Sequence, residues 1–161
     1  MKKGILFLAL VFSTAIFAQS TMKEDVEILQ SVYGKSKLQL VNEYMNLPET
    51  QKAAFMSIYD KYEIERKELG KEKVRLLDEY AKNYVSLTEE KADELAKETL
   101  KNNLNYQKLY SNYYGKFKKV IGSLDAAKFL QLENYLQTTI QLEIQNSVPF
   151  IGEIERTKKV Q

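Results

Sequence analysis

Apolar residues recur at spacings of three, four and seven along most of the chain after residue 22, and this period predicts amphipathic helices. A first helix is expected over residues 23–46, with a weak point at Gly34. A second helix begins at Pro48 and should run for about 35 residues, continuing through Gly70. The sequence contains neither a sustained alternation of apolar and polar residues nor an Asn-Gly or Asp-Gly turn, so it gives no signal for a strand. The pattern predicts an all-α fold.

Two further helices are expected in the second half of the chain. Thr88 suits the N-cap of the third helix, because its hydroxyl can accept a hydrogen bond from an unpaired backbone N–H. Asp125 suits the N-cap of the fourth helix, and Leu124 and Phe129 are spaced for a hydrophobic staple at its start. Pro149 should end this helix.

The predicted helix starts share a five-residue pattern that occurs three times: LPETQ at 47–51, LTEEK at 87–91 and LDAAK at 124–128. Helix starts in general account for about half of this repetition, because each copy places a suitable residue after the leucine. At the fifth position Gln51 could complete a capping box, whereas a lysine cannot accept the hydrogen bond that this motif needs.

The repeated pattern resembles the Leu-Thr-x-x-Gln line of the LTxxQ-motif family, the Spy/CpxP-like group of periplasmic stress proteins. FMSIY at 55–59 and FLQLEN at 129–134 are similar to lines of uncharacterised envelope members of that family. The resemblance implies a long bent helical hairpin of about four helices that forms a cradle-like dimer. It also implies ATP-independent chaperone activity or envelope-stress sensing. The positions that correspond to the family motif are Leu47, Gln51, Leu87, Thr88, Lys91 and Leu124.

The N-terminal segment has the order of a secretory signal peptide. Lys2 and Lys3 precede an apolar stretch that ends at Ala18, and the alternative is an uncleaved anchor. A cleaved protein would begin near Gln19 and lie in the periplasm or outside the cell. The expected organisation is a signal peptide over residues 1–18, a single helical domain over 19–150 and a tail over 151–161.

Composition excludes several classes of function. The chain has no His and no Cys, which excludes the usual transition-metal sites and Ser-His or Cys-His nucleophiles. Removal of Lys2 and Lys3 leaves 22 basic and 22 acidic residues, so the basic surplus of a nucleic-acid-binding protein is missing. We therefore expect no enzyme activity, no cofactor and no metal site.

The charged residues fit an exposed helix face in most places. Acid-before-base pairs at i and i+4 are expected to stabilise exposed helices, and they are Glu63–Lys67, Asp78–Lys82 and Asp93–Lys97. Arg66 differs because it lies on the apolar stripe of the second helix. We expect its side chain to cover apolar surface with its charge in water, although it could instead anchor an acidic partner.

Tyrosine is the most informative part of the composition, with 11 Tyr and no Trp. Core and inter-helix packing is one interpretation of these rings. The other is an exposed aromatic surface that binds varied unfolded segments. The candidate client-binding residues are Phe55, Tyr59, Tyr62, Tyr106, Tyr110, Tyr113 and Tyr114.

Three functions remain open from the sequence. The first is an exported chaperone-like protein that binds unfolded or partly folded proteins without ATP. The second is a signalling adaptor that binds one membrane stress sensor. The third is an unrelated small helical enzyme, which the residue inventory disfavours, or a structural envelope protein. A panel of unfolded and folded binding partners would separate the first two.

Overall fold

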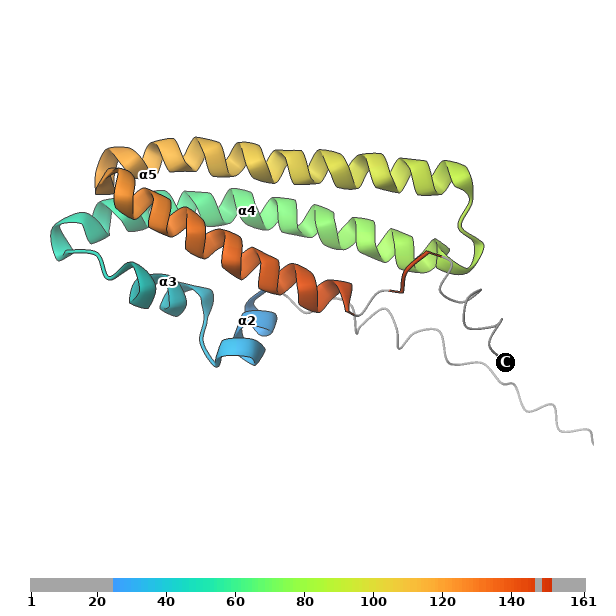
Figure 1. The fold of residues 1–161 in the computed structure, drawn as a ribbon, viewed down its shortest axis with the longest axis horizontal. Coiled ribbons are helices and arrows are strands. Elements are labelled where there is room, and N and C mark those ends of the chain that lie inside the picture. The colour runs from blue at the N-terminus through green and yellow to red at the C-terminus, as the bar shows by residue number, and fades with distance from the viewer. Residues whose placement is uncertain (1–24, 147–148, 152–161) are drawn as a thin grey trace, which may run out of the picture.

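The computed structural model describes residues 25–146 and 149–151, and the regular elements in this part of the chain are all helical. They are α2 (Asp25–Tyr33), α3 (Lys37–Met45), α4 (Glu49–Asn83), the short 3-10 helix η1 (Tyr84–Ser86) and α5 (Glu89–Gln145). Helix α4 and the first part of α5 form a long antiparallel hairpin, and the last part of α5 returns along it (Figure 1). The all-α fold and the helical hairpin are confirmed. The dimer stays a prediction, and the expected signal peptide lies outside the described residues.

The first predicted helix is divided into two. Gly34 has a φ of +67°, a left-handed conformation that glycine adopts without strain, and it ends α2. Ser36 then starts α3 with a complete capping box, in which its Oγ accepts from the Gln39 backbone N–H and Gln39 Oε1 accepts from the Ser36 N–H. The single helix over 23–46 was therefore wrong, while the weak point at Gly34 was in the right place.

Helix α4 has 35 residues, as the sequence predicts, and it continues through Gly70. Its N-cap is Pro48, which makes no side-chain capping bond and has no backbone N–H to donate to Gln51. The capping box expected at Gln51 is therefore wrong, and Gln51 Oε1 is buried without a hydrogen-bond partner. The ordered start of α4 rests instead on backbone bonds from Gln51 and Lys52 to the Pro48 carbonyl.

Helix α5 contains the break that positions the third helical layer. Gly122 has φ 82° and ψ 169°, so the chain reverses there before it continues as a helix to Gln145. We expected the fourth helix to start at Asp125, three residues later. The expected staple between Leu124 and Phe129 is also wrong, because Leu124 is 84% exposed whereas Phe129 is buried.

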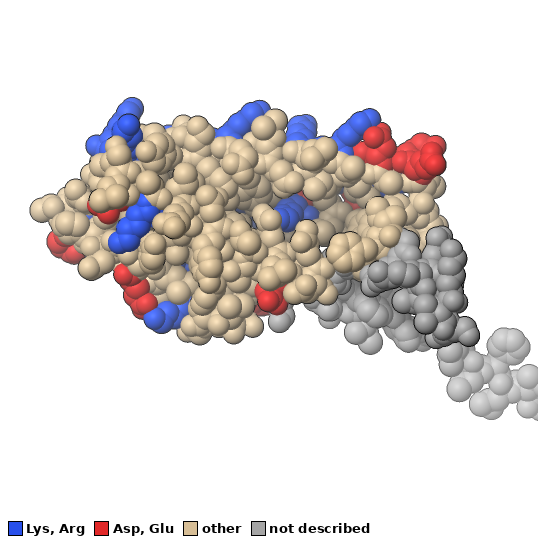
Figure 2. All heavy atoms as spheres, viewed as in Figure 1, with Lys and Arg blue, Asp and Glu red and all other residues tan. Residues whose placement is uncertain are grey.

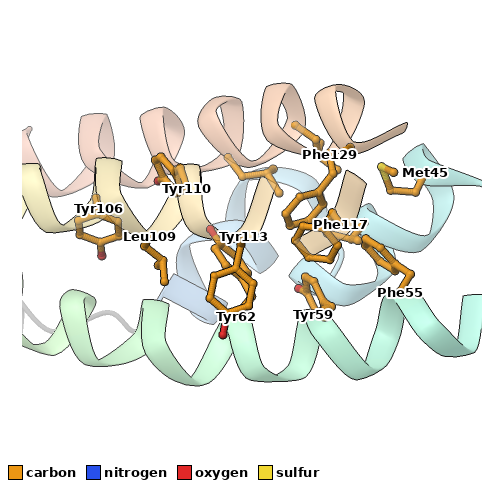
Figure 3. Packing of buried hydrophobic residues seen from close by; sticks show 14 of the residues in the cluster. Met45, Phe55, Tyr59, Tyr62, Tyr106, Leu109, Tyr110, Tyr113, Phe117 and Phe129 are labelled. Atoms are coloured by element: carbon orange, nitrogen blue, oxygen red, sulfur yellow. The ribbon is translucent and has the colours of Figure 1, made fainter. Parts of the chain in front are cut away.

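The core lies between α4 and the two parts of α5 (Figure 3). Phe117 is central to it, with ring centroids 5.1 Å from Phe55 and 4.5 Å from Phe129. Tyr62 of α4 and Tyr113 of α5 meet edge to face at 5.3 Å. Helices α2 and α3 cover one side of this core with Leu29, Val41 and Met45.

Candidate functional site

The predicted client-binding aromatic residues lie in the core. Six of the seven are at most 8% exposed, and Tyr114 is partly buried against the same cluster. They do not form an exposed surface in this structure, so that interpretation was wrong, and the core interpretation is confirmed. The reason is the return of α5 after Gly122, which covers a face that a two-helix hairpin would leave open. The buried residues are Phe55, Tyr59, Tyr62, Tyr106, Tyr110 and Tyr113.

Burial and nearby carboxylates keep the tyrosine hydroxyls neutral. Burial, reinforced by the negative charges of Glu63 and Glu133, raises the pKa of Tyr59 and of Tyr62 well above the ordinary value. Burial and the hydrogen bond that Tyr113 donates to Glu65 at 2.6 Å raise the pKa of Tyr113 to about 12. The Tyr113 hydroxyl therefore acts as a hydrogen-bond donor at neutral pH, whereas the Tyr62 hydroxyl is buried without a hydrogen-bond partner.

The family-motif positions are spread over three different environments. Thr88 is the N-cap of α5, as expected, and its Oγ accepts from the Lys91 N–H at 3.2 Å. Lys91 donates its Nζ to Glu79 at 2.9 Å and so ties the start of α5 to α4. Leu47 and Leu87 are half-buried, whereas Leu124 is exposed. The structure does not bring these positions together into one site.

A buried cluster of charges joins α3, α4 and α5, and sequence reasoning missed it. Lys37 Nζ lies 2.6 Å from Glu63 Oε1 and 2.7 Å from Glu133 Oε2. Arg66 donates to both carboxylate oxygens of Glu63, at 3.0 and 3.2 Å. Two cations thus meet two carboxylates. The Glu133 side chain has no exposed surface, and those of Lys37 and Arg66 are at most 7% exposed.

The cluster corrects two expectations about single charges. Arg66 is 1% exposed, so it neither reaches water nor offers its charge to an external partner. Glu63 faces Lys37 and Arg66 in the interior instead of standing on a solvated face with Lys67. Burial alone would raise the pKa of the Glu63 carboxyl, but the two cations outweigh burial and lower it.

We assign this cluster a structural role. Gln137 Nε2 also donates to Glu133 Oε1 at 3.1 Å, so the carboxylates are engaged from several sides. One signal in the sequence could have revealed it: Glu133 and Gln137 fall on the apolar stripe of the last helix, between Phe129 and Ile140. The cluster fastens α3 to the hairpin.

An open groove of about 480 Å³ lies at the other end of the hairpin. It lies where α4, the start of α5 and the last turns of α5 converge, next to the connection between α4 and α5. We call it the distal groove. Its apolar lining includes Leu76, Leu77, Leu87, Leu95, Leu100 and Ile144.

The distal groove also carries a few polar groups. Asn102 is 4% exposed and donates its Nδ2 to the Leu69 carbonyl at 3.1 Å, while its Oδ1 is buried without a hydrogen-bond partner. Tyr80 contributes to the lining from α4. An apolar groove with few polar groups is typical of a ligand-binding site.

Charge does not mark a site on the face shown in Figure 2, where charged side chains lie mainly around the edges and the middle carries other residue types. Within the described ranges, no group of three or more acidic residues is placed to hold a metal ion. None of the described helices is both long and apolar enough to span a membrane.

In comparisons with known proteins, no family model, no curated protein and no solved structure matches the chain.

Proposed function

We propose that the protein is an exported, non-enzymatic binding protein that holds apolar segments of unfolded or partly folded proteins without ATP. The observation that carries this proposal is the distal groove, which is open, apolar and built on long helices. The proposed binding surface therefore differs from the tyrosine residues predicted from the sequence, which lie in the core, and it is at the opposite end of the hairpin. Kinship with the LTxxQ-motif family is part of the proposal, and Thr88 supports it as a motif residue that caps α5.

The size of the distal groove fits a short piece of chain. Its volume of about 480 Å³ lies in the range of about 300–1,000 Å³ that is common for ligand sites. Each apolar side chain that a client buries there contributes about 1–3 kcal/mol before the cost of ordering it. A few such contacts give weak and reversible binding, which allows release without a nucleotide.

Export is supported by the order of basic, apolar and small residues over positions 1–18. Intact-mass analysis of the protein from its native envelope should give a chain that begins near Gln19. A chain that retains residues 1–18 in the membrane fraction would contradict export.

The proposed function is tested by aggregation of unfolded client proteins in the presence of residues 19–161, with two matched variants. Ala96 lines the distal groove and is exposed, so Ala96→Glu places a charge in the groove without disturbing the core. Ala127 is an exposed alanine of the same helix near Gly122, outside the groove, and Ala127→Glu makes the same change in net charge. We expect the wild type and Ala127→Glu to slow aggregation and Ala96→Glu to lose most of this effect at unchanged helicity.

Two results would contradict this proposal. Equal protection by Ala96→Glu and Ala127→Glu would show that the distal groove is not the binding surface. Absence of protection by the wild type at every molar ratio would reject the chaperone function and favour an adaptor that binds one partner.

A further inference from the structure

Residues 149–151 lie at the mouth of the distal groove, beside the end of α4 (Figure 1). The Tyr80 hydroxyl donates to the Pro149 carbonyl at 2.8 Å, and the Tyr84 hydroxyl donates to the Phe150 carbonyl at 2.9 Å. Ile151 forms part of the groove lining. The C-terminal segment thus covers part of the mouth of the distal groove, and about 480 Å³ of the groove stays open beside it.

These two hydrogen bonds are made to the main chain. Each residue of any peptide carries a carbonyl oxygen, so a hydroxyl donor that bonds to it does not select a side chain. Phe150 and Ile151 are 79% and 71% exposed, so their side chains are not enclosed by a specific pocket. Tyr80 and Tyr84 are one helical turn apart with rings that meet edge to face at 5.7 Å, which fixes the spacing of the two donors.

We propose that the mouth of the distal groove binds non-helical peptide segments through their main chain, and that residues 149–151 are the resident segment at this mouth, which a client must displace. The nature of the competing client rests on the proposed function, whereas the occupancy by residues 149–151 rests on the contacts of Tyr80 and Tyr84. A site that is mostly occupied by its own chain has a lower affinity for other ligands, in proportion to the fraction of sites that are free. The C-terminal segment thus sets how readily the protein accepts a client.

The occupancy is tested in the intact mature chain, which contains no natural cysteine that could interfere. Leu87 and Ile151 both line the distal groove, so the double variant Leu87→Cys/Ile151→Cys should be joined within one molecule by a short, cleavable thiol-specific cross-linker. The control Leu124→Cys/Ile151→Cys places one thiol at the exposed Leu124 position, two residues after the break at Gly122 and outside the groove lining. Intramolecular cross-linking of the first pair no faster than that of the control pair would overturn the proposal.

The competition is tested with a labelled synthetic peptide that copies residues 146–153. We expect the cross-linked Leu87→Cys/Ile151→Cys protein to bind this probe at least about ten-fold more weakly than the same protein after the linker is cleaved. Equal affinity in the two states would overturn the proposal. The aggregation assay on the cleaved protein is read separately: probe binding without client protection rejects only the proposed function, and protection without cross-linking rejects only the resident segment.

Discussion

Replacement of Lys37 by Met should destabilise the fold strongly, because it removes a cation from the buried charge cluster. In the wild type, Lys37 Nζ lies within hydrogen-bonding distance of both Glu63 and Glu133. After the change, Glu63 keeps its ion pair with Arg66, but Glu133 has lost its cation. The Glu133 side chain has no exposed surface, and the neutral Gln137 is the remaining hydrogen-bond donor to it among these residues. Loss of one partner of a buried ion pair costs about 3–5 kcal/mol, a large part of the roughly 5–15 kcal/mol that stabilises a domain.

Urea unfolding followed by far-UV circular dichroism measures this loss. Lys35→Met is the matched control two residues away, because Lys35 pairs with Glu43 on the surface, where their side chains are 45% and 57% exposed. An exposed pair is worth about 0–1 kcal/mol, so Lys35→Met should have little effect. The double variant Lys37→Met/Glu133→Gln should lose less than Lys37→Met alone, because it removes the uncompensated charge.

A loss of stability in Lys37→Met that is below about 1 kcal/mol at neutral pH, or equal to that of Lys35→Met, would refute the assignment of the cluster as the contact that holds α3 on the hairpin.

Three further changes test the fold. Gly122→Ala should destabilise the fold by about 1–3 kcal/mol, because residue 122 has a positive φ. Gly115→Ala, in the regular part of α5, should stabilise the fold by about 0.5–1 kcal/mol. Neither new Cβ meets a neighbouring side chain within 4 Å, so equal effects of the two changes in urea unfolding would contradict the backbone argument. Phe117→Ala should cost about 3–5 kcal/mol and Leu124→Ala less than about 0.5 kcal/mol, and thermal melting that ranks them otherwise would contradict the assigned core. The pKa of the Glu63 carboxyl is lowered in the fold, so Glu63 stabilises the fold above its unfolded pKa and this stabilisation is lost as the pH falls through the folded pKa. The free energy of unfolding should therefore fall more steeply with acid in the wild type than in Glu63→Gln. Identical pH curves for the two proteins would reject this contribution.

The helices could be predicted from the sequence because their signals are local. The stripe from Phe55 to Leu76 follows the helical period, and Thr88 carries a cap signal that the structure uses. The break in α5 was harder to place, since Gly122 and Asp125 both suit a helix boundary and only the backbone conformation of Gly122 decides between them. The capping box of Ser36 and Gln39 was present in the sequence as a Ser-x-x-Gln pattern and could have been found.

The candidate site was beyond local patterns. The local sequence around Tyr110 does not distinguish a side chain that faces water from one that faces a third helix. Its burial depends on where the chain returns after Gly122. Lys37 and Glu133 are 96 positions apart, so no local pattern indicates that they meet. The contacts of Tyr80 and Tyr84 with the C-terminal segment likewise join residues more than 60 positions apart.

The docking of α2 and α3 on the last part of α5 has a consequence for how the chain acquires its structure during synthesis. Tyr33 contacts Thr139 across 106 positions, and Lys37 meets Glu133 almost as far along the chain. The N-terminal helices leave the ribosome, or the far side of a translocation pore, long before their packing partner exists. Contacts of such high sequence separation form late, since the loop between them must first be closed. The first two helices therefore wait with their apolar faces uncovered until almost the whole chain has emerged, and folding is completed from the C-terminal end.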